Sequence, residues 1–271
     1  MKKVLDYSYA RFSGAQIHDL GAVAVCRYLT VVNDRTRGKL LTRAEAEELS
    51  ASGVGIVSNF EFDAKDAKGG YVRGKEYGSL ALAQHGQAGG PSSRPIYFSV
   101  DWDVADYAPS LPNTPEHATA KLGPIAEYFR GVNEQVGGPQ WTGGYGGYWA
   151  IKRLFEAGLI HWGWQTSAWS GGQWYARAGL RQKEYHGSYD VNFTEVEDFG
   201  QWRIGWTPAG GGGTPPVIPT TTQVWHKVKP RDTLTAIARH YGTTVAAIMA
   251  LNPDRIRDPD LIQVGWNIRI R

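Results

Sequence analysis

The chain contains a single cysteine and no long run of apolar residues. One cysteine excludes an intramolecular disulfide framework, so folding requires no oxidising compartment. Cys26 lies in the apolar segment 22–29 and is expected to be a buried core residue. No window approaches the ~18 apolar residues of a membrane-spanning helix. The basic start, Met1 to Asp6, lacks the apolar segment of a signal peptide, so we expect synthesis in the cytoplasm without one.

The sequence also lacks a strong net charge and the motifs of common cofactors. A net charge of +3 is too small to indicate a nucleic-acid partner. No Gly-x-Gly-x-x-Gly follows the first predicted strand, which weakens a dinucleotide site. The histidines show no His-Glu-x-x-His or comparable spacing, which disfavours a zinc amidase or a Cys/His peptidase. The histidines of the first two hundred residues are His18, His85, His117, His161 and His186. No metal and no cofactor is therefore implied.

Short apolar strands alternate with helical segments over the first two hundred residues. The predicted strands are 3–7, 23–29, 54–62, 95–101, 140–144 and 159–166, with weaker ones at 180–186 and 189–193. The predicted helices are 13–20, 43–52, 72–87, 113–136, which Pro124 is expected to kink or divide, and 148–157, with a closing helix at 195–201. This alternation predicts an α/β fold with a parallel sheet. The number of repeats favours a (β/α)8 TIM-type barrel over a doubly wound open sheet.

The composition changes sharply after residue 206. Residues 207–222 are mostly Gly, Pro and Thr with few side chains that pack, which predicts an interdomain linker. The sequence therefore predicts a barrel over 1–206, a linker over 207–222 and a small domain over 223–271.

The stretch Pro95 to Asp103 carries the first chemical signal. It begins as a β-branched and aromatic strand and ends on Asp101 and Asp103, which share a face if the strand continues. Repulsion between the two carboxylates is expected to raise the pKa of at least one, as a general acid requires near neutral pH. The alternative interpretation is a loop in which an Asp caps the next turn.

Other acidic residues fall at the ends of other predicted strands. Asp6 ends the first strand, Glu61 the third, and Asp190 lies on the eighth. In parallel barrels the loops after the strands form the active site, so we expect these carboxylates to converge at one rim. The alternative is that they pair with Arg27, Arg73 or Lys75, or face solvent.

Several short motifs together resemble the family-25 glycoside hydrolases, which are lysozyme-type muramidases. These are Leu5-Asp6-Tyr7-Ser8, the acidic end of the fourth strand, Trp162-Gly163-Trp164-Gln165 and Tyr189-Asp190-Val191-Asn192. The chain is more similar to a related glycoside-hydrolase-like domain of unknown function, found in bacterial wall-associated proteins and phage lysins. The resemblance covers residues 3–206. The muramidases have Asp-x-Glu where this chain has Asp101-Trp102-Asp103, so the implied acid is one methylene shorter.

The resemblance implies roles for the acidic residues. Asp103 would protonate the leaving oxygen, with Glu61 as the alternate acid, and Asp101 would tune its neighbour's pKa. Asp6 and Asp190 would orient a 2-acetamido group or a water and stabilise the oxocarbenium-like charge. Side chains expected to bind substrate are Trp102, Tyr148, Trp164, Gln165, Trp169 and Asn192, although core packing is the alternative for each ring.

The last fifty residues resemble a LysM module. A strand near Trp225, helices at 235–241 and 245–251, and an alternating segment at 264–270 give a β-α-α-β order. LysM modules bind polymers containing N-acetylglucosamine, such as peptidoglycan and chitin. The usual Gly before the Asp-Thr is Arg231 here. The contact residues that the resemblance implies are Asp232, Thr233, Leu234, Asp258, Pro259, Asp260, Leu261 and Ile262.

We therefore predict a peptidoglycan-degrading glycosidase of the muramidase or endolysin type, anchored to the wall by its LysM module. The enzyme is expected to be a monomer that acts on the cell wall after release, as a phage lysin or a virion-associated protein. The alternative is a cell-wall-binding protein with a glycosidase-like barrel and no catalysis, which the short Asp103 favours.

Overall fold

The structure is a computed structural model that describes residues 1–206, 225–230, 232–241, 243–252, 255–256 and 258–270. The chain divides into two compact units, Met1–Pro216 and Val217–Arg271. The predicted linker, residues 207–222, lies outside the described residues. No helix in the described part of the chain has the length and apolar character needed to cross a membrane.

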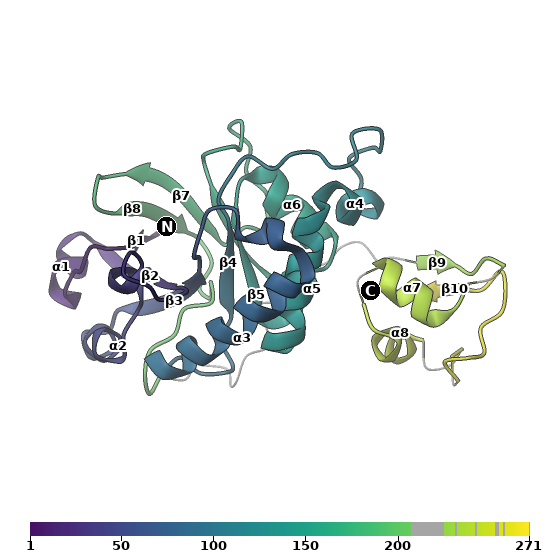
Figure 1. Cartoon of the computed structure of the whole chain (residues 1–271), viewed down its shortest axis with the longest axis horizontal. Helices are drawn as coiled ribbons and strands as arrows, with labels where there is room; N and C mark the ends of the chain where they lie inside the picture. The colour runs from purple at the N-terminus through teal and green to yellow at the C-terminus, as the bar shows by residue number, and fades with distance from the viewer. Residues whose placement is uncertain (207–224, 231, 242, 253–254, 257, 271) are drawn as a thin grey trace. The chain divides into compact units, whose positions relative to one another are not determined.

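Eight strands of the first unit form a closed barrel in sequence order (Figure 1). The strands are β1 (Lys2–Asp6), β2 (Ala22–Leu29), β3 (Gly55–Phe60), β4 (Ile96–Val100), β5 (Thr142–Gly146), β6 (Trp162–Thr166), β7 (Leu180–Tyr185) and β8 (Asp190–Thr194). The predicted α/β barrel is confirmed, and the doubly wound alternative is wrong because β1 pairs with β8.

The expectation that every strand is parallel is wrong for β8. This strand runs antiparallel to both β7 and β1, whereas all other neighbours in the barrel are parallel. The reason is the short turn after Tyr185, since a parallel crossover needs a dozen or more residues. As a consequence the first residue of β8, Asp190, pairs with the last residue of β1, Asp6.

One or more helices follow each of the first five strands in the sequence. They are α1 (Gly14–Asp19), α2 (Arg43–Ala51), α3 (Gly70–Ala88), α4 (Ala118–Leu122), α5 (Pro124–Val136) and α6 (Tyr148–Glu156). Short 3-10 turns occupy Arg37–Lys39, Asp66–Gly69, Pro115–His117 and Pro139–Trp141. The predicted helix 113–136 is divided at Gly123, which has φ 55°, because the residue before Pro124 is disfavoured in helical geometry.

The predicted closing helix at 195–201 is wrong. These residues form an irregular segment that leads to Trp202, which pairs with Ile56 of β3. Asp198 caps the turn by accepting a hydrogen bond from the Gly200 N–H at 3.1 Å, and Gly200 itself has φ 88°. A left-handed glycine ends helical geometry, so the local sequence favours a turn over a helix.

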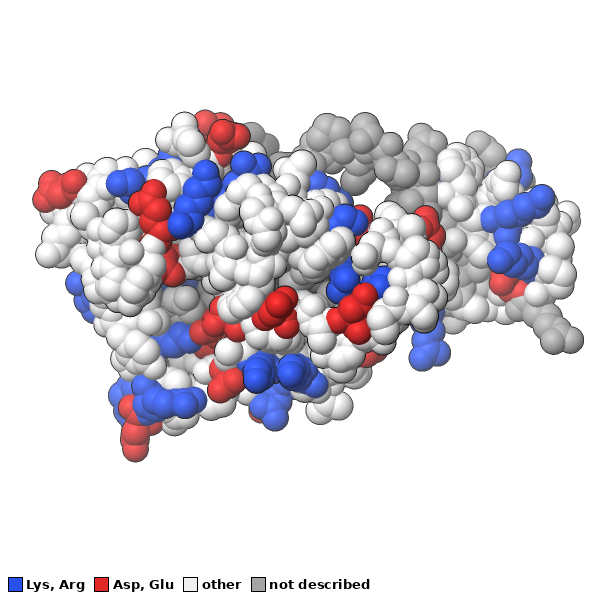
Figure 2. Space-filling view, turned by 90° about the horizontal axis from the view of Figure 1, so that it is seen from above, with Lys and Arg blue, Asp and Glu red and all other residues white. Residues whose placement is uncertain are grey.

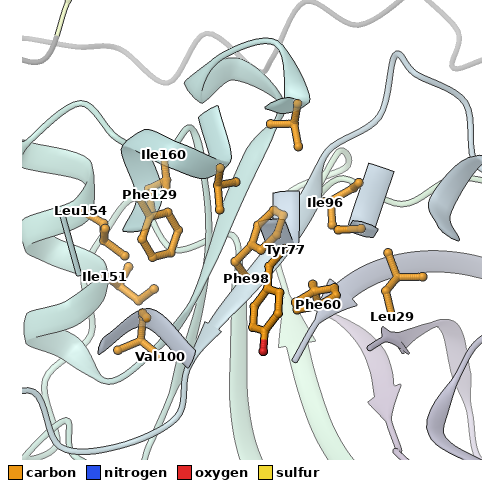
Figure 3. Close-up of a cluster of buried hydrophobic side chains, with 14 of the residues drawn as sticks. Leu29, Phe60, Tyr77, Ile96, Phe98, Val100, Phe129, Ile151, Leu154 and Ile160 are labelled. Atoms are coloured by element: carbon orange, nitrogen blue, oxygen red, sulfur yellow. The ribbon is translucent and has the colours of Figure 1, made fainter. Parts of the chain in front are cut away.

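Two apolar layers hold the barrel together. Inside the barrel, side chains such as Val4, Tyr97 and Trp164 fill the interior. Between the strands and the surrounding helices a larger layer contains Phe98 and Tyr77, shown in Figure 3. Because side chains alternate along each strand, this division fixes which residues can point inward at the rim.

The second unit has the predicted β-α-α-β order. Its elements are β9 (Trp225–Lys227), α7 (Leu234–Tyr241), α8 (Val245–Leu251) and β10 (Asn267–Arg269). The two strands pair antiparallel, with Ile268 opposite His226. Its buried core comprises Val228, Leu234, Ile237, Ala238, Ile248, Ile256, Ile268 and Ile270.

Candidate active site

Four carboxylates meet at the rim where the parallel strands end: Asp6, Glu61, Asp101 and Asp190. Asp6 points into the barrel because it has the parity of Val4, and Asp190 lies opposite it on β8. Glu61 and Asp101 follow the last residues of β3 and β4. Electrostatic coupling links Asp6 to Asp190 and Glu61, and Asp101 to Glu61 and Asp190. We refer to these four residues as the rim carboxylates.

Two amides hold Asp6 and Asp190 in place. Asn192 donates from Nδ2 to Asp6 Oδ2 at 2.6 Å, and Gln182 donates from Nε2 to Asp190 Oδ2 at 2.6 Å. Gln182 Nε2 also lies 3.4 and 3.3 Å from the two oxygens of Asp6. The Trp164 indole N–H donates to Asn192 Oδ1 at 2.6 Å, which fixes the amide with its NH2 group toward Asp6.

Burial and like charge act together on Asp6. Its side chain is almost inaccessible, and burial, followed by the Asp190 carboxylate, raises the pKa of Asp6 to about 7. Burial also raises the pKa of Asp190. Among the described residues, Asp190 Oδ1 is buried and has no hydrogen-bond partner. This oxygen therefore lacks the hydrogen bond that a buried acceptor normally makes.

A lysine lies beside Glu61. Lys39 Nζ donates to Glu61 Oε1 at 2.6 Å, and the same ammonium lies 4.4 Å from the centre of the Tyr28 ring. Both side chains of the ion pair are largely buried. Burial raises the pKa of the Tyr28 hydroxyl well above its usual value, so this hydroxyl remains protonated.

The pKa of Asp101 also lies in the range that a general acid needs, and unlike Asp6 this residue is partly exposed. Burial is the main cause, and the Glu61 carboxylate adds to it, so that the pKa of Asp101 rises to about 6. Lys39 opposes the rise and Asp190 supports it. The predicted cause, repulsion by Asp103, was wrong. The strand ends at Val100, so strand alternation does not carry through to Asp103, whose side chain is exposed.

The cations proposed as alternative partners pair elsewhere. Arg27 forms an ion pair with Glu45, with its Nε 2.6 Å from Glu45 Oε1. Arg73 pairs with Glu76, and Lys75 with Glu134. None of the three neutralises a rim carboxylate within the described residues.

Three of the predicted substrate-binding residues are buried. Trp164 is fully buried inside the barrel. Gln165 braces the loop after β6, with Nε2 2.7 Å from the Gln173 carbonyl and Oε1 accepting from the Tyr175 N–H at 2.8 Å. Asn192 is also buried, and its role in this structure is to hold Asp6.

Three predicted aromatic residues lie after strand ends. Trp102 is partly buried, with the Lys68 ammonium 5.6 Å from its ring centre. Tyr148 begins α6, and its N–H donates to Ser170 Oγ at 3.0 Å. Trp169 is 39% exposed and has φ 54°, a strained conformation for a residue other than glycine.

Sequence reasoning missed Gln182, Tyr145, Tyr28 and Lys39. Gln182 has the parity of Leu180, which fills the barrel interior, so the period-2 pattern of β7 could have placed it inward. Tyr145 donates from its hydroxyl to Gln182 Oε1 at 2.8 Å. Lys39 comes from a 3-10 turn far from Glu61 in sequence, and no local pattern could have indicated that contact.

Several predicted contact residues in the LysM unit serve its own fold. Asp232 Oδ2 lies 2.7 Å from His226 Nε2 and accepts from the Lys229 N–H at 2.7 Å, and hydrogen bonding to His226 lowers the pKa of Asp232. Thr233 caps α7 through the Ala236 N–H, and Leu234 is buried in the core. The exposed contact residues are Asp258, Pro259, Asp260 and Leu261, whereas Ile262 is partly buried.

The closed eight-stranded barrel is the fold of a glycoside-hydrolase-like protein, and a separate β-α-α-β unit follows it. A comparison with protein families matches residues 15–211 to the "Rv2525c-like, glycoside hydrolase-like domain" and residues 226–271 to the LysM domain. The chain belongs to the Rv2525c-like glycoside hydrolase-like family and carries a C-terminal LysM domain.

Similar proteins come from a bacterium and from a phage. "Putative peptidoglycan hydrolase Rv2525c" of Mycobacterium tuberculosis is 32% identical over 216 residues, which cover 73% of this chain and 83% of that protein. The crystal structure of the Tat-secreted Rv2525c in complex with HEPES has a TM-score of 0.64 and 29% identity, covering 74% of this chain and 98% of that one. An endolysin of Bacillus phage PZA is 49% identical over 45 residues, 17% of each protein.

Proposed function

We propose that this protein hydrolyses glycosidic bonds in the glycan strands of peptidoglycan. The observation that carries the proposal is the convergence of the rim carboxylates, of which Glu61 pairs with Lys39 and Asp101 has a pKa raised to about 6. Glycoside hydrolysis needs one carboxylic acid that protonates the leaving oxygen and a carboxylate that acts on the anomeric centre or its water.

Asp101 takes the role of the acid in this proposal. Its half-buried carboxyl group holds a proton more readily than an ordinary aspartate and lies beside Glu61. Asp103 is exposed, so we do not assign it as the acid. Glu61 is paired with Lys39 beside Asp101 and is not assigned as the acid either. Asp6 and Asp190 orient the 2-acetamido group or a water and stabilise positive charge at the anomeric carbon.

In this proposal the LysM domain binds the peptidoglycan. Its family binds glycans containing N-acetylglucosamine, and the exposed loop 258–261 offers the implied contacts. Attachment raises the effective concentration of the barrel at the wall. The mycobacterial relative carries the name of a peptidoglycan hydrolase, which supports the same substrate. Release onto a host wall, as by a phage lysin, is the setting we propose, because the LysM segment also resembles one in a phage endolysin.

The experiment is digestion of purified peptidoglycan followed by chemical analysis of the products. New reducing ends, without new amino groups, are the expected result. New amino groups would indicate an amidase or a peptidase instead. Co-sedimentation with peptidoglycan in the absence of any product would favour the non-catalytic wall-binding alternative.

A further inference from the structure

Gln182 of β7 connects two of the rim carboxylates. Its Nε2 atom donates to Asp190 Oδ2 at 2.6 Å and lies 3.3 Å from Asp6 Oδ2 and 3.4 Å from Asp6 Oδ1. Gln182 is 9% exposed, so water competes little for these contacts. One NH2 group therefore serves two carboxyl groups that face each other across the β1–β8 pair.

The orientation of this amide is fixed by Tyr145. The Tyr145 hydroxyl donates to Gln182 Oε1 at 2.8 Å, and the Tyr145 ring packs 4.5 Å from the Trp164 ring. Burial raises the pKa of the Tyr145 hydroxyl well above its usual value, so it remains a donor. Because Oε1 accepts this bond, the NH2 group must face the carboxylates.

The surroundings favour one negative charge on the pair. Gln182 and Asn192 supply N–H donors, which stabilise a carboxylate, but a second buried charge of the same sign is costly. Lys39 is engaged with Glu61. The titratable and charged groups that face Asp6 and Asp190 are Glu61, Asp101, Cys26, Tyr28, Lys39, Tyr145 and His186.

We propose that Gln182, oriented by Tyr145, is a positioning residue that couples Asp6 and Asp190 into a pair holding one proton and one negative charge. The inference deepens the proposed function and rests on it for its catalytic meaning. Gln182 binds Asp190 Oδ2, and Asp190 Oδ1 is buried with no hydrogen-bond partner among the described residues. The pair then titrates in two steps that belong to both residues together.

The test is a titration of the aspartate carboxyl carbons by ¹³C NMR, which requires no catalytic activity. In the wild type we expect a titration step near neutral pH that the carboxyl carbons of Asp6 and Asp190 share and that disappears in Asp6→Asn. In Gln182→Met this midpoint rises by about one pH unit, because hydrogen bonds to a charged group favour its ionised form. Tyr145→Phe should raise it by a smaller amount.

The matched control is Gln84→Met. Gln84 is 7% exposed and makes two hydrogen bonds to the backbone of Thr30, so its loss disturbs the fold without touching the rim. The midpoint should stay at the wild-type value in this variant. An unchanged midpoint in both Gln182→Met and Tyr145→Phe, or no aspartate titrating above pH 5 in the wild type, would overturn the proposal.

If Gln182→Met does not fold, a second variant at the same position can be used for the titration. Gln182→Glu keeps the size of the side chain and its acceptor for Tyr145 but replaces the NH2 donor with a carboxylate, so the rise should be larger. If the titrations behave as expected and peptidoglycan yields no reducing ends, the coupling stands and the proposed function fails. If peptidoglycan is cleaved and the midpoints do not move, the proposed function stands and the coupling fails.

Discussion

At the end of the barrel where the parallel strands begin, Asp198 lies against Arg94, whose side chain is 2% exposed, with Arg94 Nη1 3.0 Å from Asp198 Oδ2. At the opposite end, Asp6 and Asp190 face each other with amides and no cation as hydrogen-bond partners among the described residues. The first arrangement pairs a buried charge with a counter-charge, whereas in the second, burial raises the pKa of both carboxyl groups. The difference separates acids that stabilise the fold from acids that are available for chemistry.

The surface between the two ends shows neither arrangement. On the face seen in Figure 2, Lys and Arg side chains are interspersed with Asp and Glu. Pairs such as Arg43 with Glu47, one helical turn apart, are exposed and contribute little to stability. Asp6 and Asp190, which have no cation as a hydrogen-bond partner within the described residues, therefore differ from the ion pairs that this chain forms elsewhere.

The largest expected effect comes from removing the proton donor at the rim. Asp101→Asn keeps the shape of the side chain but cannot give up a proton, so the rate of glycan cleavage should fall by about 10²–10⁴-fold. The matched control is Asp103→Asn, two residues away on an exposed side chain, which should leave the rate near that of the wild type. Reducing-end release measures both. Equal losses in the two variants would contradict the assignment of Asp101.

A substitution in the Arg94–Asp198 ion pair should change the stability of the protein rather than the rate of glycan cleavage. Asp198→Asn leaves the buried Arg94 guanidinium without its counter-charge, so the free energy of unfolding should fall by about 3 kcal/mol. Asp190→Asn at the rim has no cation to strand and should not lower stability. Urea denaturation of the two variants makes the comparison. A larger loss of unfolding free energy in Asp190→Asn than in Asp198→Asn would contradict the distinction between the two ends of the barrel.

The rim should also make stability depend on pH. The pKa of Asp6 is about 7 in the folded protein against 3.8 for the unfolded group, so the folded state binds the extra proton. This contribution is fully present below pH 4 and is lost as pH rises through 7. Between these limits the free energy of unfolding should fall by about 3–4 kcal/mol. Asp6→Asn should flatten the slope measured by urea unfolding at pH 4.5 and 7.5, and an unchanged slope would count against a protonated Asp6.

The smallest effect concerns the lysine beside the rim. Lys39 lowers the pKa of Asp101, so Lys39→Met should raise that pKa and shift the high-pH loss of activity upward by about half a unit. Arg43→Met, on an exposed ion pair, is the control and should leave the pH profile in place. A downward shift in Lys39→Met would show that Lys39 acts on another group.

Sequence patterns were sufficient for the elements that depend on local chemistry. Thr42 accepts from the Glu45 N–H at 3.2 Å as the N-cap of α2, and Pro124 divides a long helix at the predicted position. Strand ends also placed Asp6, Glu61 and Asp101 at one rim, because the carboxyl ends of parallel strands share an edge. Because β8 runs antiparallel, its first residue, Asp190, lies at the rim where the parallel strands end. The reversal of β8 therefore leaves Asp190 at the predicted rim.

The rest of the site depends on contacts between residues far apart in the chain. Gln182 and Asp6, for example, are 176 positions apart. Residues 195–201 were predicted as a helix but form an irregular segment, in which Asp198 forms an ion pair with Arg94. Strand alternation placed Asp103 beside Asp101, but β4 ends before either residue. Where the strand stops is decided by tertiary packing, which a single sequence does not specify.

The most direct measurement is the pH dependence of reducing-end release from purified peptidoglycan by the wild-type protein. If Asp101 must carry a proton, kcat/KM should be constant at lower pH and fall about tenfold per pH unit above about 6. No reducing ends at any pH between 4 and 8, or a rate that keeps rising above pH 7, would contradict carboxyl acid catalysis at this rim.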